Sequence, residues 1–144
     1  MNEFEPTFVD TWGWLAFGHR RDSHHEAVRS YLERLLRENV PIYTSDYVLD
    51  ETITLIFRRE QYDDARSFVG QLFRAIEDGE IQREQVTTAR FGAAWTLRRQ
   101  FQDKPDISFT DLTSMAIMQE MGLSHVLTGD SHFEHVGFNF RLVP

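Results

Sequence analysis

Apolar residues recur along the chain in two patterns, and the two patterns alternate. Short apolar runs bounded by polar or turn residues predict buried strands. These runs lie at residues 7–9, 41–44, 81–86, 125–128 and 138–143. Between them, apolar side chains return every three to four positions, which is typical of helices that bury one face. The expected helices cover 12–17, 27–36, a segment that begins at Ser45 or Asp46, 65–76, 91–101 and 108–121.

Polar residues and glycines mark where several of these helices begin and end. We expect Asp22 or Ser23 to cap the helix at 27–36, and Ser108 to begin the last helix. Gly122 follows the last helix, where a glycine in the left-handed conformation commonly ends it. No repeat and no Pro/Gly/Ser-rich linker divides the 144 residues. The pattern therefore predicts one α/β domain, with a mostly parallel central sheet flanked by helices.

Four acidic residues stand at the ends of these elements or on their apolar faces. Asp10 and Asp130 directly follow predicted strands, Asp111 lies in the first turn of a helix, and Glu51 interrupts an apolar helix face. Ligands of parallel sheets collect beyond the carboxyl ends of the strands, so the four acids can converge there. A carboxylate near an apolar core costs several kcal/mol unless it is paired or binds a cation. Lys104 is the only lysine, so we hypothesise that the acids share a divalent metal ion.

Each acid also has an ordinary structural explanation. Ser108 and Asp111 match a helix-capping pattern, in which the carboxylate complements the helix dipole. Asp130 follows Gly129 in a predicted turn, where aspartate is common. Asp10 can cap the helix that follows it. Taken singly, Asp111 and Asp130 are better explained by these structural roles, whereas four such acids together favour a metal site.

Charge and composition narrow the class of protein. A net charge of −8 argues against a general nucleic-acid coat protein, because affinity for phosphates comes from a basic surface. It does not argue against an enzyme that acts on nucleic acid, whose acid cluster a metal would neutralise. Fourteen of the fifteen basic residues are arginine, with pairs at 20–21, 58–59 and 98–99. Arginine suits bidentate phosphate contacts, although a GC-rich genome encodes the same bias and is the simpler explanation.

Further features of the sequence bear on redox chemistry and location. Cysteine is absent, which excludes disulfides, cysteine nucleophiles and thiolate metal sites. No apolar run is long enough to span a bilayer. The acidic segment Met1–Glu5 is unlike the basic start of a signal peptide. We therefore expect a cytoplasmic protein that does not contact the membrane.

Four sequence blocks around these acids resemble the PIN domains and, within them, the VapC-type toxin ribonucleases. The blocks are Phe8–Thr11, Thr44–Glu51, Ile107–Ala116 and Thr128–Phe133, each containing one of the four acids. Each block is short, but their order, spacing and strand–helix context together are specific. The resemblance spans nearly the whole chain and implies one PIN-like nuclease domain over residues 1–144.

The resemblance implies a site for Mg²⁺ or Mn²⁺ and a role for each acid. Asp10 and Asp111 match the strongest metal ligands of the family. Glu51 matches an acid that binds the metal or positions water, and Asp130 one that binds a second metal or acts through water. Hard divalent cations of this kind take oxygen ligands and can activate water for attack on a phosphodiester.

Other residues in or beside these blocks are given supporting roles. Thr11 and Ser108 are expected to donate hydrogen bonds around the metal ligands, and Thr128 to touch the substrate. Asp50 and Asp106 are additional carboxylates whose contribution the sequence leaves open.

The function implied is a metal-dependent endoribonuclease, the toxin of a type II toxin–antitoxin pair. The expected partners are an RNA substrate, a second copy of the chain in a homodimer, and a small antitoxin. The antitoxin would lay an amphipathic helix in a groove and send an arginine toward the acids. Two alternatives stay open: a housekeeping PIN-domain ribonuclease in RNA processing, and a PIN-like module that binds a partner without catalysis.

Other folds and chemistries fit the residues less well. A haloacid-dehalogenase-like phosphatase needs a second aspartate where this chain has Trp12, and a later lysine that is missing. A receiver domain needs a lysine after a late strand, and Lys104 precedes the wrong element. Histidine metal chemistry is suggested only by His132 and His135 and by the adjacent pair His24 and His25. A pair three residues apart near the end of the chain is more often at the surface or in a turn, and histidine suits zinc better than a carboxylate cluster does. The aromatic residues Trp12 and Trp14 are better explained by packing in the core than by a surface that binds a partner.

Overall fold

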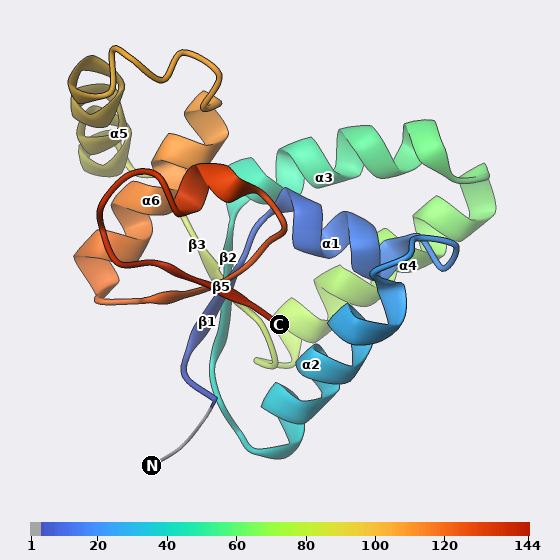
Figure 1. Cartoon of the computed structure of the whole chain (residues 1–144). Coiled ribbons are helices and arrows are strands. Elements are labelled where there is room, and N and C mark those ends of the chain that lie inside the picture. The colour runs from blue at the N-terminus through green and yellow to red at the C-terminus, as the bar shows by residue number, and fades with distance from the viewer. Residues whose placement is uncertain (1–3) are drawn as a thin grey trace.

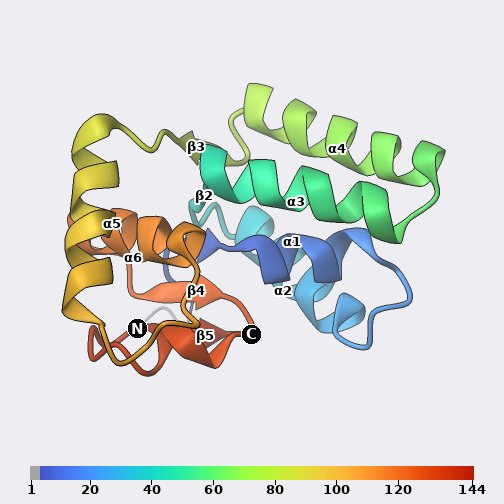
Figure 2. The same cartoon turned by 90° about the horizontal axis from the view of Figure 1, so that it is seen from above.

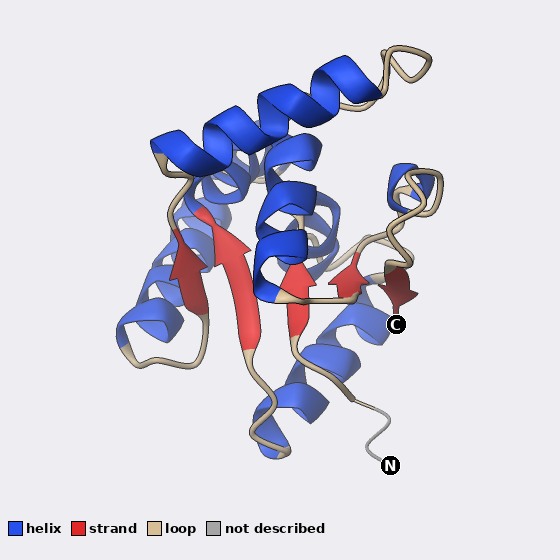
Figure 3. Ribbon diagram, turned by 90° about the vertical axis from the view of Figure 1, so that its left-hand side faces the viewer, coloured by secondary structure: helices blue, strands red, loops and turns tan. Residues whose placement is uncertain are grey.

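A five-stranded sheet lies at the centre of the structure, a computed structural model that describes residues 4–144. The strands are β1 (Thr7–Val9), β2 (Ile42–Ser45), β3 (Gln82–Glu84), β4 (His125–Leu127) and β5 (Arg141–Val143). Their order across the sheet is β3-β2-β1-β4-β5, and every neighbouring pair is parallel, which confirms the predicted α/β fold. Because neighbouring strands are parallel, their carboxyl ends share one edge of the sheet (Figure 3).

Within residues 4–144, six α-helices connect and cover the strands. They are α1 (Thr11–Gly18), α2 (His25–Arg37), α3 (Asp46–Arg59), α4 (Tyr62–Glu77), α5 (Thr88–Gln100) and α6 (Phe109–Met121). A short 3₁₀ helix, η1 (Ser131–Phe133), follows β4. Figures 1 and 2 show α5 and α6 on one side of the sheet, and α1 and α2 on the other. No helix within residues 4–144 has the length and apolar character needed to cross a bilayer.

The helix boundaries show where local signals in the sequence were sufficient. Ser45 and Ser108 cap α3 and α6 as expected, and Gly122 ends α6 in the left-handed conformation, at φ 69°. The predicted cap of α2 is wrong, because this helix begins at His25 with His24 at the capping position. The Asp22 carboxylate instead accepts a hydrogen bond from the backbone N–H of His24 at 2.7 Å, and so stabilises the turn before the helix.

Trp14 joins α1 to the sheet. Its indole N–H donates to the hydroxyl of Thr44 at 2.9 Å, and that hydroxyl donates to the carbonyl oxygen of Val9 at 3.0 Å. The Trp14 side chain is fully buried, so these bonds form where water does not compete. The result is a fixed junction between the end of β1, the start of α1 and the neighbouring strand β2. Asp10 lies at this junction.

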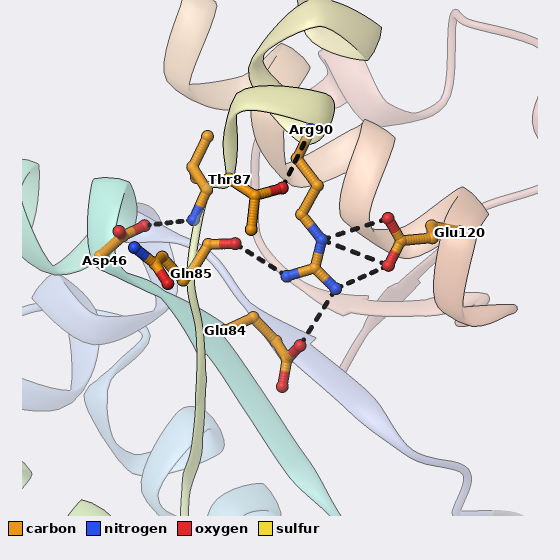
Figure 4. Close-up of polar contacts among 7 residues, drawn as sticks. Asp46, Glu84, Gln85, Thr87, Arg90 and Glu120 are labelled. Carbon is orange, nitrogen blue, oxygen red and sulfur yellow. Dashed lines mark hydrogen bonds and ion pairs between the residues drawn. The ribbon is translucent and has the colours of Figure 1, made fainter.

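A cluster around Arg90 fixes the connection between β3 and α5 against α6 (Figure 4). The guanidinium donates to the carboxylates of Glu84 at 3.1 Å and Glu120 at 2.6 Å, and to the carbonyl oxygen of Gln85 at 2.8 Å. The hydrogen bond with Glu120 is the main reason that the pKa of Arg90 is raised above its ordinary value. Because Glu120 belongs to α6, this cluster holds the helix that carries Asp111.

Candidate metal centre

Asp10 is buried at the carboxyl end of the central strand, where it caps α1. Its side chain is only 3% exposed. Oδ2 accepts a hydrogen bond from the Thr128 hydroxyl at 2.7 Å, and Oδ1 accepts one from the backbone N–H of Gly13 at 3.2 Å. A side chain at Gly13 would meet the carbonyl oxygen of Leu127 at 2.7 Å, so only glycine fits this turn.

The burial of Asp10 disfavours its charged form. Desolvation raises the pKa of Asp10 to about 7, and the nearby carboxylates of Asp111 and Asp130 add to the rise. The hydrogen bonds from Thr128 and Gly13 act in the opposite direction. A charged carboxylate in this environment destabilises the fold unless a positive charge binds to it.

Asp111 approaches the same point from the first turn of α6. The Ser108 hydroxyl accepts a hydrogen bond from the backbone N–H of Asp111 at 3.1 Å, so the predicted cap is present and leaves the Asp111 carboxylate free of the capping role. Burial raises the pKa of Asp111 to about 6, and the charges of Asp130 and Glu51 contribute to the rise. The cap is therefore confirmed, and it is compatible with the predicted metal role of Asp111, because the cap uses the backbone N–H and leaves the carboxylate available.

Asp130 and His132 complete this side of the site. Asp130 caps η1, since its side chain accepts a hydrogen bond from the backbone N–H of His132 at 2.9 Å. His132 Nδ1 lies 3.2 Å from Asp130 Oδ1 and 3.8 Å from Asp111 Oδ2, yet it forms no hydrogen bond within residues 4–144. One ligand atom from each of the three side chains fits within a span of 4.8 Å, which is compatible with a single metal ion.

A cleft of about 330 Å³ brings the predicted residues together. It is lined by Asp10, Glu51, Asp111 and Asp130, and by two further acids, Asp22 and Asp106. The sequence left open whether Asp50 or Asp106 contributes. The structure places Asp106 in the wall of the cleft, whereas Asp50 is exposed on α3 and does not line it.

The three residues with expected supporting roles occupy different positions. Thr11 and Ser108 line the cleft, and the buried hydroxyl of Thr11 has no hydrogen-bond partner within residues 4–144. Thr128 is 4% exposed and does not line the cleft. The expected contact of Thr128 with substrate is therefore corrected by the structure, because its hydroxyl is buried against Asp10.

The donor set of the cleft fits a hard divalent cation. Within residues 4–144, no lysine or arginine forms an ion pair with Asp10, Glu51, Asp111 or Asp130. Several carboxylate oxygens around a wet cleft suit Mg²⁺ or Mn²⁺. The imidazole of His132 adds a nitrogen, which Mn²⁺ accepts more readily than Mg²⁺ does. From the sequence, His132 is expected at the surface and not among the metal ligands, although its position two residues after Asp130 was an available signal.

The comparison with known protein families agrees with this geometry. The family model described as "PIN domain" matches residues 7–139, which is nearly the whole chain. The chain belongs to the PIN domain family. The resemblance to VapC-type PIN domains that the four sequence blocks indicated is thereby confirmed, together with the fold.

Two solved structures show how closely this PIN domain follows its relatives. VapC20 from Mycobacterium tuberculosis, described as a toxin that cleaves the sarcin-ricin loop, is 31% identical, with a TM-score of 0.74. The match covers 92% of this chain and 95% of that protein. VapBC2 from Rickettsia felis, bound to a DNA fragment from its promoter, matches with a TM-score of 0.73 at 16% identity, over 94% and 96% of the two chains. No curated protein sequence resembles the chain closely enough to count as a match.

Proposed function

We propose that this PIN domain is a metal-dependent endoribonuclease that acts as the toxin of a toxin–antitoxin pair. The observation that carries the proposal is the convergence of four carboxylates from four distant segments in one cleft, with no lysine or arginine paired to them within residues 4–144. The raised pKa values of Asp10 and Asp111 support it, because a bound cation would favour the charged forms that burial and, to a smaller extent, mutual repulsion disfavour. The relationship to VapC20 supports RNA as the substrate.

Asp10, Glu51, Asp111 and Asp130 would hold Mg²⁺ or Mn²⁺, and His132 would add an imidazole ligand. When bound, such a cation supplies positive charge that stabilises a phosphodiester under attack and makes water more acidic. The protein contributes orientation. Thr128 and Gly13 hold the Asp10 carboxylate in one position, and the backbone N–H of His132 does the same for Asp130.

The proposal is tested by incubating the purified protein with a mixed pool of structured RNAs that includes a sarcin-ricin stem–loop. The reactions contain Mg²⁺, Mn²⁺ or EDTA, and a parallel series uses the Asp111→Asn variant. Cleavage that requires metal and that the variant lacks is the expected result. Failure of well-folded, partner-free protein to cleave any of the RNAs would contradict the proposal and favour a module that only binds a partner.

The remaining parts of the proposal have their own tests. A toxin is expected to copurify with the product of an adjacent small gene and to lose activity in that complex. A housekeeping ribonuclease would show no such partner. Sedimentation of the purified chain tests the proposed homodimer, for which a mass twice that of the 17.0 kDa chain is expected.

A further inference from the structure

A second cavity, of about 590 Å³, lies where α1 and α3 end and α4 begins. Four arginines line it, namely Arg20, Arg21, Arg29 and Arg59. Only two carboxylates do so, Glu60 and Asp64, and Glu60 is already paired with His19. In a protein whose net charge is −8, this basic groove is a local reversal of sign.

Three of the four arginines are available for a ligand. Arg29 is held by Glu26 and Glu33, with both contacts at 2.8 Å. Arg20, Arg21 and Arg59 are exposed and form no hydrogen bond or ion pair in the described part of the chain. Arg59 lies in the last turn of α3, where it complements the helix dipole, so its position alone would not indicate a ligand. Arg20 and Arg21 lie in the turn after α1, and the dipole of α3 does not explain them.

The basic groove adjoins the acidic cleft, because Arg59 lines both. Glu51, Leu55 and Arg59 are spaced by four residues, so they lie on one face of α3. At a rise of about 1.5 Å per residue, Glu51 and Arg59 are separated by about 12 Å along that helix. Figure 2 shows α1 running beside α3, and α1 likewise leads from Asp10 to the turn that carries Arg20 and Arg21.

We propose that Arg20, Arg21 and Arg59 bind the phosphodiester backbone of the RNA on one side of the bond that is cut in the cleft. This inference rests on the proposed ribonuclease function and adds the path of the strand. The span of about 12 Å corresponds to about three phosphates at the roughly 3.4 Å spacing of a stacked strand. An arginine fork matches the geometry of a phosphate, and the groove needs no base-specific group to hold a backbone.

RNA explains this arrangement better than an acidic protein segment does. A strand that is cut in the cleft has to leave the cleft, and the exposed face of α3 leads directly to the arginines. An acidic segment seated in the groove has no reason of its own to continue toward a cluster of six carboxylates, unless it carries a basic residue such as the arginine expected of an antitoxin. The RNA backbone does have a reason to continue into the cleft, because its scissile phosphate has to reach the metal ligands.

The test is a binding measurement in which cleavage plays no part. All proteins carry Asp111→Asn, and the probe is a fluorescein-labelled single-stranded RNA of about 12 nucleotides, followed by anisotropy in Mg²⁺ at several salt concentrations. The test protein adds Arg20→Gln, Arg21→Gln and Arg59→Gln. The matched control adds Arg74→Gln, Arg83→Gln and Arg99→Gln, three exposed arginines that line neither cavity and change the net charge equally.

The variant with Arg20→Gln, Arg21→Gln and Arg59→Gln is expected to bind the RNA at least about tenfold more weakly than its Asp111→Asn parent. Its plot of log affinity against log salt concentration should be less steep by about 2. The control is expected to stay within about twofold of the parent at moderate salt. Equal affinity of the two triple variants would overturn the proposal, and so would a parent that does not bind the RNA. Metal-dependent cleavage by the wild-type chain is measured separately, so loss of this inference would leave the ribonuclease proposal standing.

Discussion

The hydroxyl of Thr128 donates a hydrogen bond to Oδ2 of Asp10 at 2.7 Å and accepts one from the backbone N–H of Asp130 at 3.0 Å. One buried side chain thus joins two of the four acids, one from the end of β1 and one from the turn after β4. The contact spans two neighbouring strands whose pairing places Val9 opposite Leu127. Thr128 therefore fixes the position of Asp10 and of the turn that carries Asp130.

Replacing Thr128 with valine keeps the shape of the side chain and removes the hydroxyl. We expect a loss of about 1.5–3 kcal/mol in the free energy of unfolding, because a buried hydrogen bond to a charged group disappears. Affinity for Mn²⁺ is expected to fall by about 10- to 100-fold, since the Asp10 carboxylate loses the hydrogen bond that orients it toward the metal. Urea unfolding and titration calorimetry measure the two effects. Thr128→Ser keeps the hydroxyl and should retain most of the metal affinity; equal losses in both variants would contradict a role for the hydrogen bond.

Replacing Asp111 with asparagine separates the metal site from the helix cap. The cap uses the backbone N–H of Asp111 and the Ser108 hydroxyl, so α6 should remain intact. We expect ribonuclease activity to fall by about 10³-fold, from the loss of several kcal/mol of charge stabilisation. Without metal, the thermal transition at pH 8 should stay the same or rise, because the variant removes repulsion among carboxylates. A large fall in the metal-free transition would instead assign Asp111 a structural role.

Local signals account for the parts of this structure that the sequence predicted. The run Thr7–Val9 is short and fully buried, and it forms the central strand. Ser45 and Ser108 cap their helices through hydrogen bonds to residues three positions later, which a sequence pattern can show. The convergence of Asp10 and Asp130 follows from the rule that parallel strands present their carboxyl ends at one edge.

The parts that were wrong or missed depend on contacts between distant segments. Thr128 lies next to Asp130 in the sequence, but its burial against Asp10 is decided by strand pairing. His132 lies beside Asp111 only because η1 folds over the start of α6. The cap of α2 was placed too early, at Asp22 or Ser23 and not at His24, because Asp22 stabilises its own turn and the periodicity of the helix does not reveal that choice.

Replacing His132 with glutamine tests whether the imidazole is a metal ligand. Affinity for Mn²⁺ should fall by about tenfold or more, the equivalent of about 1.4 kcal/mol, while affinity for Mg²⁺ should change less. The difference is expected because Mg²⁺ prefers oxygen ligands. Calorimetry with each ion measures it, and electron paramagnetic resonance of bound Mn²⁺ reports the loss of a nitrogen ligand. His135→Gln is the control, since His135 is exposed and does not line the cleft. Equal losses for both ions would indicate that His132 acts only through the acids.

The raised pKa values of Asp10 and Asp111 predict how metal-free stability depends on pH. Both pKa values are higher in the folded protein, at about 7 and about 6, than the ordinary 3.8, so the folded state holds these protons more tightly. Stability from this source is therefore greatest near pH 4 and decreases as the pH rises toward 7.

Asp111→Asn should abolish the part of this decrease that comes from Asp111. The free energy of unfolding of the variant is therefore expected to exceed that of the wild type at pH 8 but not at pH 4. Urea unfolding in EDTA across this range measures the difference. Metal has to displace the same protons, so Mn²⁺ binding near pH 6 should release protons and weaken as the pH falls. Calorimetry in buffers with different heats of ionisation detects that release. A stability difference that does not change with pH would show that Asp111 is not buried among the other carboxylates.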